Sequence, residues 1–294
     1  MFYTFNDFRR HNEGREISNH KDFYQKFSNE REFGGEFSHD DHLLKNRFMD
    51  VYSTVINIIL RHKPANLIDV GCGAGMYLPL SGYFPSVDYT GLDYADQAIN
   101  SVKSKYPKVV FRTGDAFSIP FENQCFDVAI LSGVLILYKS RDDQEALLKE
   151  VLRVTKKDGI LILIVWNDAL LFRWCVKISR LLAIIRRKDT LKDFMGVHFS
   201  NKEITSLSES VGGKVEYIYN TAAHHGLIES CHYLSLRKYT RRFDASEKPN
   251  RAKLSQNYLQ DLENASGWPF KFLFPICRIL PSLFNMYSIC VIRK

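Results

Sequence analysis

The feature that most constrains the fold is the run Leu67–Gly75, where a short apolar segment is followed by glycine at every second position. An apolar run with a β-branched residue before a glycine-rich turn is typical of a buried parallel strand that leads into a helix. Glycines let a ligand approach the backbone closely and leave N–H groups available at the helix N-terminus. The run therefore predicts an α/β fold with a ligand site at this turn.

Strands and helices alternate on either side of that turn. Apolar residues recur at spacings of three and four from Asp41 to His62, which predicts one face of an amphipathic helix that ends at Pro64. The strand candidates that follow are Asn66–Val70, Val87–Leu92, Val109–Thr113, Asp127–Leu131 and Ile160–Val165. Helical windows lie between them near Gly75–Tyr83, Ala95–Lys105 and Arg141–Thr155. Strands joined by crossover helices predict a doubly wound, parallel sheet.

Acidic and hydroxyl side chains follow the ends of these strands. The first three strands are followed or ended by Asp69, Asp93 and Asp115, and the fourth ends at Ser132. Sheets of this kind bind ligands at the carboxyl ends of their strands, where a carboxylate can accept hydrogen bonds from a ribose diol. The glycines follow a G-x-G-x-G spacing, which differs from the G-x-G-x-x-G of a dinucleotide fingerprint.

Several runs together resemble a class I S-adenosylmethionine-dependent methyltransferase, in its small-molecule and quinone-biosynthesis branch. They are Leu67–Gly75, Asp93, Gly114–Ala116, Phe126–Ala129 and Glu150–Gly159, and the resemblance covers about residues 40 to 220. It implies a Rossmann-like, mostly parallel seven-stranded sheet with helical insertions. It also implies an antiparallel last strand, and the runs Lys214–Tyr219 and Met286–Ile292 fit the final pair.

The same resemblance implies S-adenosyl-L-methionine as the cofactor and assigns its contacts. Residues that would hold the methionine part are Asp69, Gly71, Cys72, Gly73 and Gly75. Asp93 would bind the ribose hydroxyls and Tyr94 would pack on the adenine, while Asp115 and Ala116 would lie at its edge, with Ser132 on the same rim. A transferase of this kind must hold the acceptor in line with the methyl group and exclude water.

The general base is not identified by sequence. Relatives often carry histidines just after the fourth strand, where this chain has Ile136 and Leu137. The candidates that remain are His198, His224, His225 and Tyr138. His198 precedes a helix with Ser200 as its expected N-cap and could equally be a packed histidine. Adjacent histidines point in different directions on a regular element, so no metal site is expected.

The composition of the chain changes after about Trp166, where the predicted α/β core ends, and this suggests the domain organisation. Residues 1–40 are expected to be an N-terminal arm or lid, and residues 41–294 a single methyltransferase domain. Insertions 168–199 and 224–284 are expected to form a substrate-side cap. Cations interleave with long apolar runs there, which favours a lid, a membrane-surface contact or a homodimer interface.

These patterns define the expected partners. The net charge is +7, yet the chain shows no recognised RNA-binding module, so nucleic acid is disfavoured. The expected acceptor is a small or lipid-linked molecule such as a glycan, lipid or quinone precursor, with RNA methylation or a non-catalytic, cofactor-binding regulatory subunit as alternatives. Six scattered cysteines without a C-x-x-C pair, together with a polar N-terminus, indicate a cytoplasmic protein. If the basic, apolar insertions contact a membrane, the protein is expected to be peripheral at its inner face.

Overall fold

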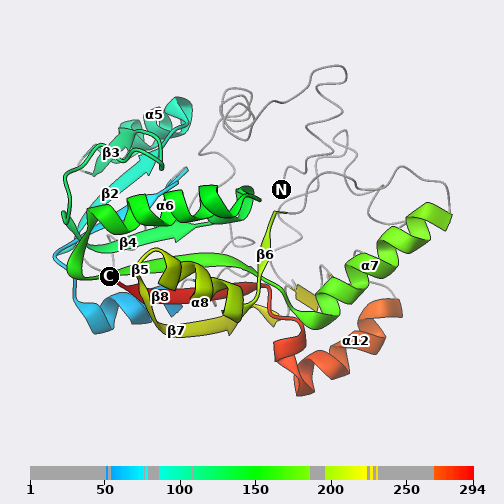
Figure 1. The fold of residues 1–294 in the computed structure, drawn as a ribbon. Helices are drawn as coiled ribbons and strands as arrows, with labels where there is room; N and C mark the ends of the chain where they lie inside the picture. Colours follow the sequence, from blue (N-terminus) through cyan, green and yellow to red (C-terminus); the bar gives the residue numbers. More distant parts are fainter. Residues whose placement is uncertain are drawn as a thin grey trace.

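The protein folds around one central sheet (Figure 1). The computed structural model describes residues 51, 54–73, 75, 77–78, 86–107, 109–185, 196–223, 226–227, 230 and 268–294. The expected arm or lid at residues 1–40 lies outside these residues, so that assignment stays a prediction.

The sheet has the mostly parallel topology that the sequence predicts, with one additional strand. Its strands are β1 (Asn66–Val70), β2 (Asp88–Asp93), β3 (Val110–Thr113), β4 (Phe126–Ser132), β5 (Thr155–Asn167), β6 (His198–Phe199), β7 (Lys214–Thr221) and β8 (Tyr287–Arg293). Their order is β3-β2-β1-β4-β5-β8-β7, and β6 pairs with β5. β8 runs antiparallel to both of its neighbours, which confirms the expected last strand.

Helices cover both faces of the sheet. The regular helices are α5 (Asp96–Lys105), α6 (Arg141–Val154), α7 (Leu170–Ile185), α8 (Asn201–Ser210) and α12 (Trp268–Ile279). Of the helix predicted for Asp41–His62, residues 51 and 54–62 are helical, and the others lie outside the described residues. The described part of the chain also contains the 3₁₀ turns η1 (Leu135–Leu137) and η3 (Pro281–Leu283). Of the helix expected at Gly75–Tyr83, the three described residues 75, 77 and 78 lie in turns, and the others fall outside the described residues.

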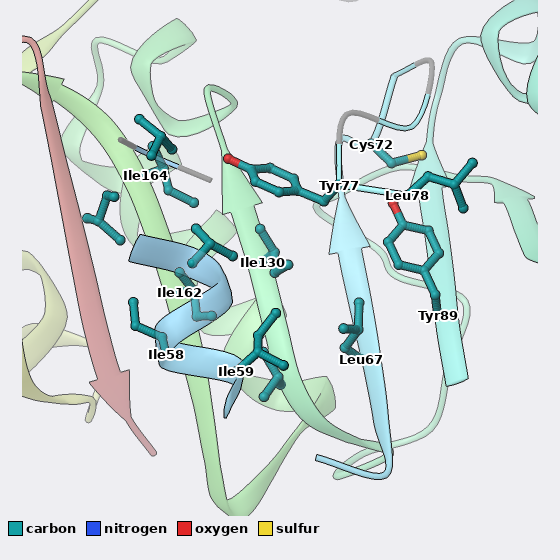
Figure 2. Packing of buried hydrophobic residues seen from close by; sticks show 14 of the residues in the cluster. Ile58, Ile59, Leu67, Cys72, Tyr77, Leu78, Tyr89, Ile130, Ile162 and Ile164 are labelled. Carbon is teal, nitrogen blue, oxygen red and sulfur yellow. The ribbon is translucent and has the colours of Figure 1, made fainter. Parts of the chain in front are cut away.

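Two apolar clusters fill the space between helices and sheet. One cluster joins the helix at residues 54–62 and α5 to one face of the sheet, and Figure 2 shows Ile58 and Ile59 beside Ile130 and Ile162. The other joins α6 and α8 to the opposite face. Consecutive residues of the buried strands, such as Leu67 and Ile68, point into different clusters. This explains why the strands are apolar throughout.

Helix termini are fixed by local side chains. Ser200 is the N-cap of α8, as predicted: its hydroxyl accepts a hydrogen bond from the Glu203 N–H, and the Glu203 carboxylate accepts one from the Ser200 N–H. This reciprocal capping box fixes where α8 begins, directly after β6. None of the helices that the structure describes has the length and apolar character needed to span a bilayer.

Candidate functional site at the carboxyl edge of the sheet

The parallel strands β1, β2, β3 and β4 bring the predicted site residues to one edge. β1 pairs in parallel with both β2 and β4, and Asp69 of β1 lies opposite Gly91 and Ile130. β3 pairs with β2 in the same sense, so Asp93 lies opposite Thr113, two residues before Asp115. The three acids therefore belong to one continuous edge.

The glycine turn after β1 has a backbone that other residues rarely adopt. Gly71, Gly73 and Gly75 have φ angles of 76°, 52° and 81°. The N–H groups of Gly71 and Cys72 both donate to the Leu92 carbonyl, at 2.7 and 3.0 Å, which fixes the turn against the end of β2. A Cβ on Gly71 would lie 2.2 Å from Cγ2 of Val134. The positive φ favours glycine at this position, and any larger residue would also displace the Val134 side chain.

Asp93 ties the glycine turn to the helix that follows β2. Its Oδ2 accepts a hydrogen bond from the Gly73 N–H at 2.7 Å, and its Oδ1 accepts one from the Ala95 N–H at 2.9 Å. Burial raises the pKa of this carboxyl group, while the N–H donors oppose the shift. A carboxylate offers about four acceptor sites, so Asp93 keeps acceptor capacity for a ligand hydroxyl.

Asp69 lies deeper than Asp93. The Tyr89 hydroxyl donates a hydrogen bond of 2.6 Å to its Oδ2. Burial raises the pKa of Asp69 to about 7, partly opposed by that hydrogen bond and reinforced by the charge of Asp93. Burial also raises the pKa of the Cys72 thiol well above its ordinary value, so this thiol stays protonated and is a poor nucleophile.

A network from α6 holds the segment that carries Asp115 and Ala116. The Arg153 guanidinium donates to the Phe121 and Ile119 carbonyls, both at 2.9 Å, and pairs with Glu150 at 2.8 Å. Glu150 in turn accepts from the Ile119 N–H at 2.7 Å. The segment after β3 is therefore fixed to the helix that follows β4.

The turn at Asp115 is also closed locally. Oδ1 of Asp115 accepts a hydrogen bond from the Phe117 N–H at 3.0 Å. The Phe117 ring packs edge-on against Tyr138, with the ring centroids 5.0 Å apart. Burial raises the pKa of the Tyr138 phenol, which therefore stays protonated at neutral pH.

The end of β4 forms the next part of the edge. The Ser132 and Tyr77 hydroxyls lie 3.1 Å apart in a hydrogen bond, and Figure 2 shows the Tyr77 ring reaching over the end of β4. Gly133 has a φ of 70°, and a Cβ built on it would meet no atom within 4 Å. The backbone there borders open space.

His198 lies where β6 meets the end of β5. Its Nδ1 is 3.1 Å from the Gly196 carbonyl, and its ring lies between Trp166 and Phe172, with centroids 5.2 and 5.1 Å away. Because a carbonyl only accepts, Nδ1 carries the proton and Nε2 carries the lone pair. Nε2 is buried and has no hydrogen-bond partner among the residues that the structure describes. Burial lowers the pKa of His198, which keeps the ring neutral at pH 7.

The other two histidine candidates for the base stay predictions. His224 and His225 lie outside the described residues. No cluster of three or more His, Cys, Asp or Glu side chains within the described part of the chain could hold a metal ion.

The structure adds contacts that the sequence did not identify. Tyr77 and Tyr89 each contact a site residue 20 or more positions away along the chain, and Arg153 holds the segment that follows Asp115. The Asp127 carboxylate accepts hydrogen bonds from the Ala65 and Asn66 N–H groups and so fixes the start of β1. No local periodicity marks these residues; only their polar character inside apolar runs could have drawn attention to Tyr77 and Tyr89.

The edge fits a nucleoside with a diol and a cationic group. Acceptor carboxylates line the ends of β1 and β2, and the positive-φ glycine backbone lies between them. Carboxylates stabilise a nearby cation, and glycines permit close approach. These are the properties that S-adenosylmethionine requires.

Comparisons with known proteins agree with this geometry. A family model described as a methyltransferase domain matches residues 68–163. A Bos taurus protein named "Probable tRNA methyltransferase 9B" is 31% identical over 113 residues, which are 38% of this chain and 24% of that protein. Demethylmenaquinone methyltransferase from Thermotoga maritima is 27% identical over 111 residues, 37% of this chain and 47% of the relative.

The matches to these curated relatives span less than half of their length. A solved structure of magnesium protoporphyrin IX methyltransferase from Synechocystis, with bound SAH, is 17% identical and covers 69% of this chain and 89% of its own, with a TM-score of 0.50. At that identity the likeness concerns the fold, which is the Rossmann-like arrangement described above.

Proposed function

We propose that this chain, which carries a class I S-adenosylmethionine-dependent methyltransferase domain matched over residues 68–163, transfers a methyl group to a small or lipid-linked acceptor. The observation that carries the proposal is the carboxyl edge itself, where a glycine turn lies between the carboxylates of Asp69 and Asp93. When bound, S-adenosylmethionine supplies a methyl group on an electrophilic sulfonium.

Different residues of the edge would contact different parts of the cofactor. Asp93 would accept hydrogen bonds from the ribose hydroxyls while remaining tied to the Gly73 N–H. Asp115 and Ala116 would border the adenine, on a segment that Arg153 fixes to α6. Asp69, whose pKa is raised to about 7, would face the methionine part. Each of these groups is held by hydrogen bonds within the protein, which limits reorganisation on binding.

His198 is our candidate for the residue that takes the proton from a hydroxyl acceptor. Its Nδ1–H donates to Gly196, so its Nε2 lone pair is left to accept a proton. The rings of Trp166 and Phe172 flank it and favour an apolar, ring-bearing acceptor over a polyanion. This apolar setting is why we place a quinone or lipid precursor ahead of RNA.

RNA is the second candidate acceptor. It is favoured by the names of several relatives, including the Bos taurus protein that is named a probable tRNA methyltransferase. The matched part covers 24% of that relative, so the rest of the relative has no counterpart in this comparison.

Methyl transfer from labelled S-adenosylmethionine into cell extract tests both candidates. The extract is separated afterwards into lipid, small-molecule and RNA fractions, and the fraction with label names the acceptor class. Label in the lipid or small-molecule fraction supports the proposal, whereas label only in RNA overturns the choice of acceptor. Binding of cofactor without label in any fraction would identify a non-catalytic subunit and overturn the proposed activity.

His198→Gln tests the proposed base. We expect methyl transfer to fall by about 100-fold with cofactor affinity unchanged, since general-base catalysis contributes roughly 10²–10⁴-fold. We also expect the acidic limb of the pH–rate profile to disappear. A variant that loses activity but keeps the profile of the wild type would show that His198 only packs.

A further inference from the structure

Helix α7 exposes an apolar stripe where a surface helix ordinarily carries polar residues. Leu170, Trp174, Ile178 and Leu181 follow helical spacing, and Trp174 and Leu181 are 53% and 58% exposed. Phe172, on the opposite side, is buried. The helix therefore buries one apolar face against the protein and presents a second one outward.

Helix α12 repeats this arrangement. Phe272, Ile276 and Ile279 lie on one side, and Phe272 and Ile279 are 74% and 77% exposed. Cys277 is buried on the other side. Leu280, directly after the helix, is exposed as well. Large side chains exposed in a contiguous group mark an interaction surface.

The two stripes border one cluster. Leu171 of α7 and Leu273 and Phe274 of α12 pack around the buried residues Cys277 and Phe284. Both helices contact the turn η3, and Figure 1 shows them beyond the same end of the sheet. We name the outward residues of both helices the α7–α12 face, which consists of Leu170, Trp174, Ile178, Leu181, Phe272, Ile276 and Ile279.

The charged residues within the two helices are all basic. Within α7 and α12 the charged residues are Arg173, Lys177, Arg180, Lys271 and Arg278, with no Asp or Glu. Arg173 is paired with Asp168 at 2.7 Å, and the Lys177 ammonium lies 5.5 Å from the centre of the Trp174 ring. Cations are thus interleaved with exposed apolar side chains along both helices.

We propose that the α7–α12 face docks the protein on the surface of an anionic phospholipid bilayer. Amphipathic helices with cations beside a large apolar face lie in the membrane interface, where acyl chains cover the apolar residues and anionic headgroups attract the cations. A second copy fits less well, because two such faces would bring like charges together. A polyanion such as RNA would leave the apolar stripes exposed.

The α7–α12 face lies near the proposed acceptor site. α7 begins three residues after β5 ends, next to Trp166 and His198 at the proposed acceptor site. A lipid-linked acceptor could then reach the site from the membrane plane. Docking itself needs no cofactor, so it stands or fails independently of the proposed methyl transfer.

Flotation with vesicles tests the proposal. The full chain is mixed with vesicles of phosphatidylcholine alone or of phosphatidylcholine with phosphatidylglycerol, at low and at high salt. We expect flotation with the anionic vesicles at low salt and a marked loss at high salt. Trp174→Glu and Lys177→Glu should each lower the partition coefficient about tenfold or more.

Matched controls separate this surface from general effects. Leu60→Glu changes an equally exposed apolar residue on another helix, and Lys103→Glu makes the same charge reversal on α5. Both should float like the wild type. Circular dichroism and S-adenosylhomocysteine titration on every variant show that the domain is folded and that any loss is specific to docking.

Three results would overturn the proposal. They are no flotation with anionic vesicles, equal losses in the control variants, or a concentration-dependent dimer that Trp174→Glu abolishes. RNA that binds the wild type and is lost in Lys177→Glu, without flotation, would assign the face to nucleic acid instead. A protein that floats but fails to bind cofactor would keep the docking inference and refute the proposed function.

Discussion

Replacement of Gly71 by alanine tests how tightly the glycine turn is specified. Gly71 has a φ of 76°, and a Cβ there would lie 2.2 Å from Cγ2 of Val134. The left-handed conformation costs about 1–2 kcal/mol for a residue with a Cβ. Overpacking against Val134 adds about 1–3 kcal/mol. We therefore expect Gly71→Ala to lower the free energy of unfolding by about 2–5 kcal/mol.

Gly212 provides a matched control. It has a similar φ of 83°, but a Cβ there would meet nothing within 4 Å. Gly212→Ala should therefore cost only the conformational part, about 1–2 kcal/mol. The entropy lost by the unfolded chain is the same for both variants, so the difference between them isolates the clash with Val134.

A double-mutant cycle identifies the clash directly. Val134→Ala removes Cγ2, and the remaining Val134 Cβ is 3.6 Å from the added methyl group, an ordinary contact. Urea denaturation of Gly71→Ala, Val134→Ala and the double variant should give a coupling of about 1–3 kcal/mol. Equal costs for Gly71→Ala and Gly212→Ala, or additivity with Val134→Ala, would refute this account of the turn.

Three further predictions concern other parts of the site. Because burial raises the pKa of Asp69 to about 7, this group keeps a proton in the folded protein that it loses above pH 4 in the unfolded chain, so the contribution of Asp69 to the free energy of unfolding should fall by at most about 4 kcal/mol from pH 4 to pH 7. Asp69→Asn should remove this slope in urea titrations, and an unchanged slope would contradict the assignment. Arg153→Met should cost about 2 kcal/mol and weaken S-adenosylhomocysteine binding in calorimetry, since it frees the segment beside Asp115; unaltered binding would mean that the network is only structural. Ser200→Ala should lose about 1 kcal/mol in urea denaturation without affecting binding, as expected for an N-cap.

Local patterns were enough to place most of the sheet. β1 spans the predicted residues, and β2 and β3 start one residue later than predicted. β5 begins earlier than predicted. Its first four residues, Thr155–Asp158, are mostly charged and partly exposed, so they show no apolar pattern. β6 has two residues, too few for any periodicity to be visible.

For the site, the positions of the acidic residues could be predicted from the sequence, but the contacts that hold them could not. Asp69 and Asp93 could be predicted because each follows a recognisable strand, and parallel strands align their ends. The contacts that hold them could not, because the partners are remote: Tyr89 lies 20 residues from Asp69, and Gly73 lies 20 residues from Asp93. A sequence pattern specifies which face a residue occupies, whereas the partner across the sheet depends on register.

Calorimetric titration with S-adenosylhomocysteine tests the central claim most directly. The wild type should bind one equivalent, and Asp93→Ala should raise the Kd by at least about tenfold, since hydrogen bonds to a charged group contribute about 1.5–3 kcal/mol each. Asp88→Ala, at the exposed amino end of the same strand, should bind like the wild type. Absence of binding by the wild type, or equal affinity of Asp93→Ala, would contradict the assignment of the carboxyl edge as the cofactor site.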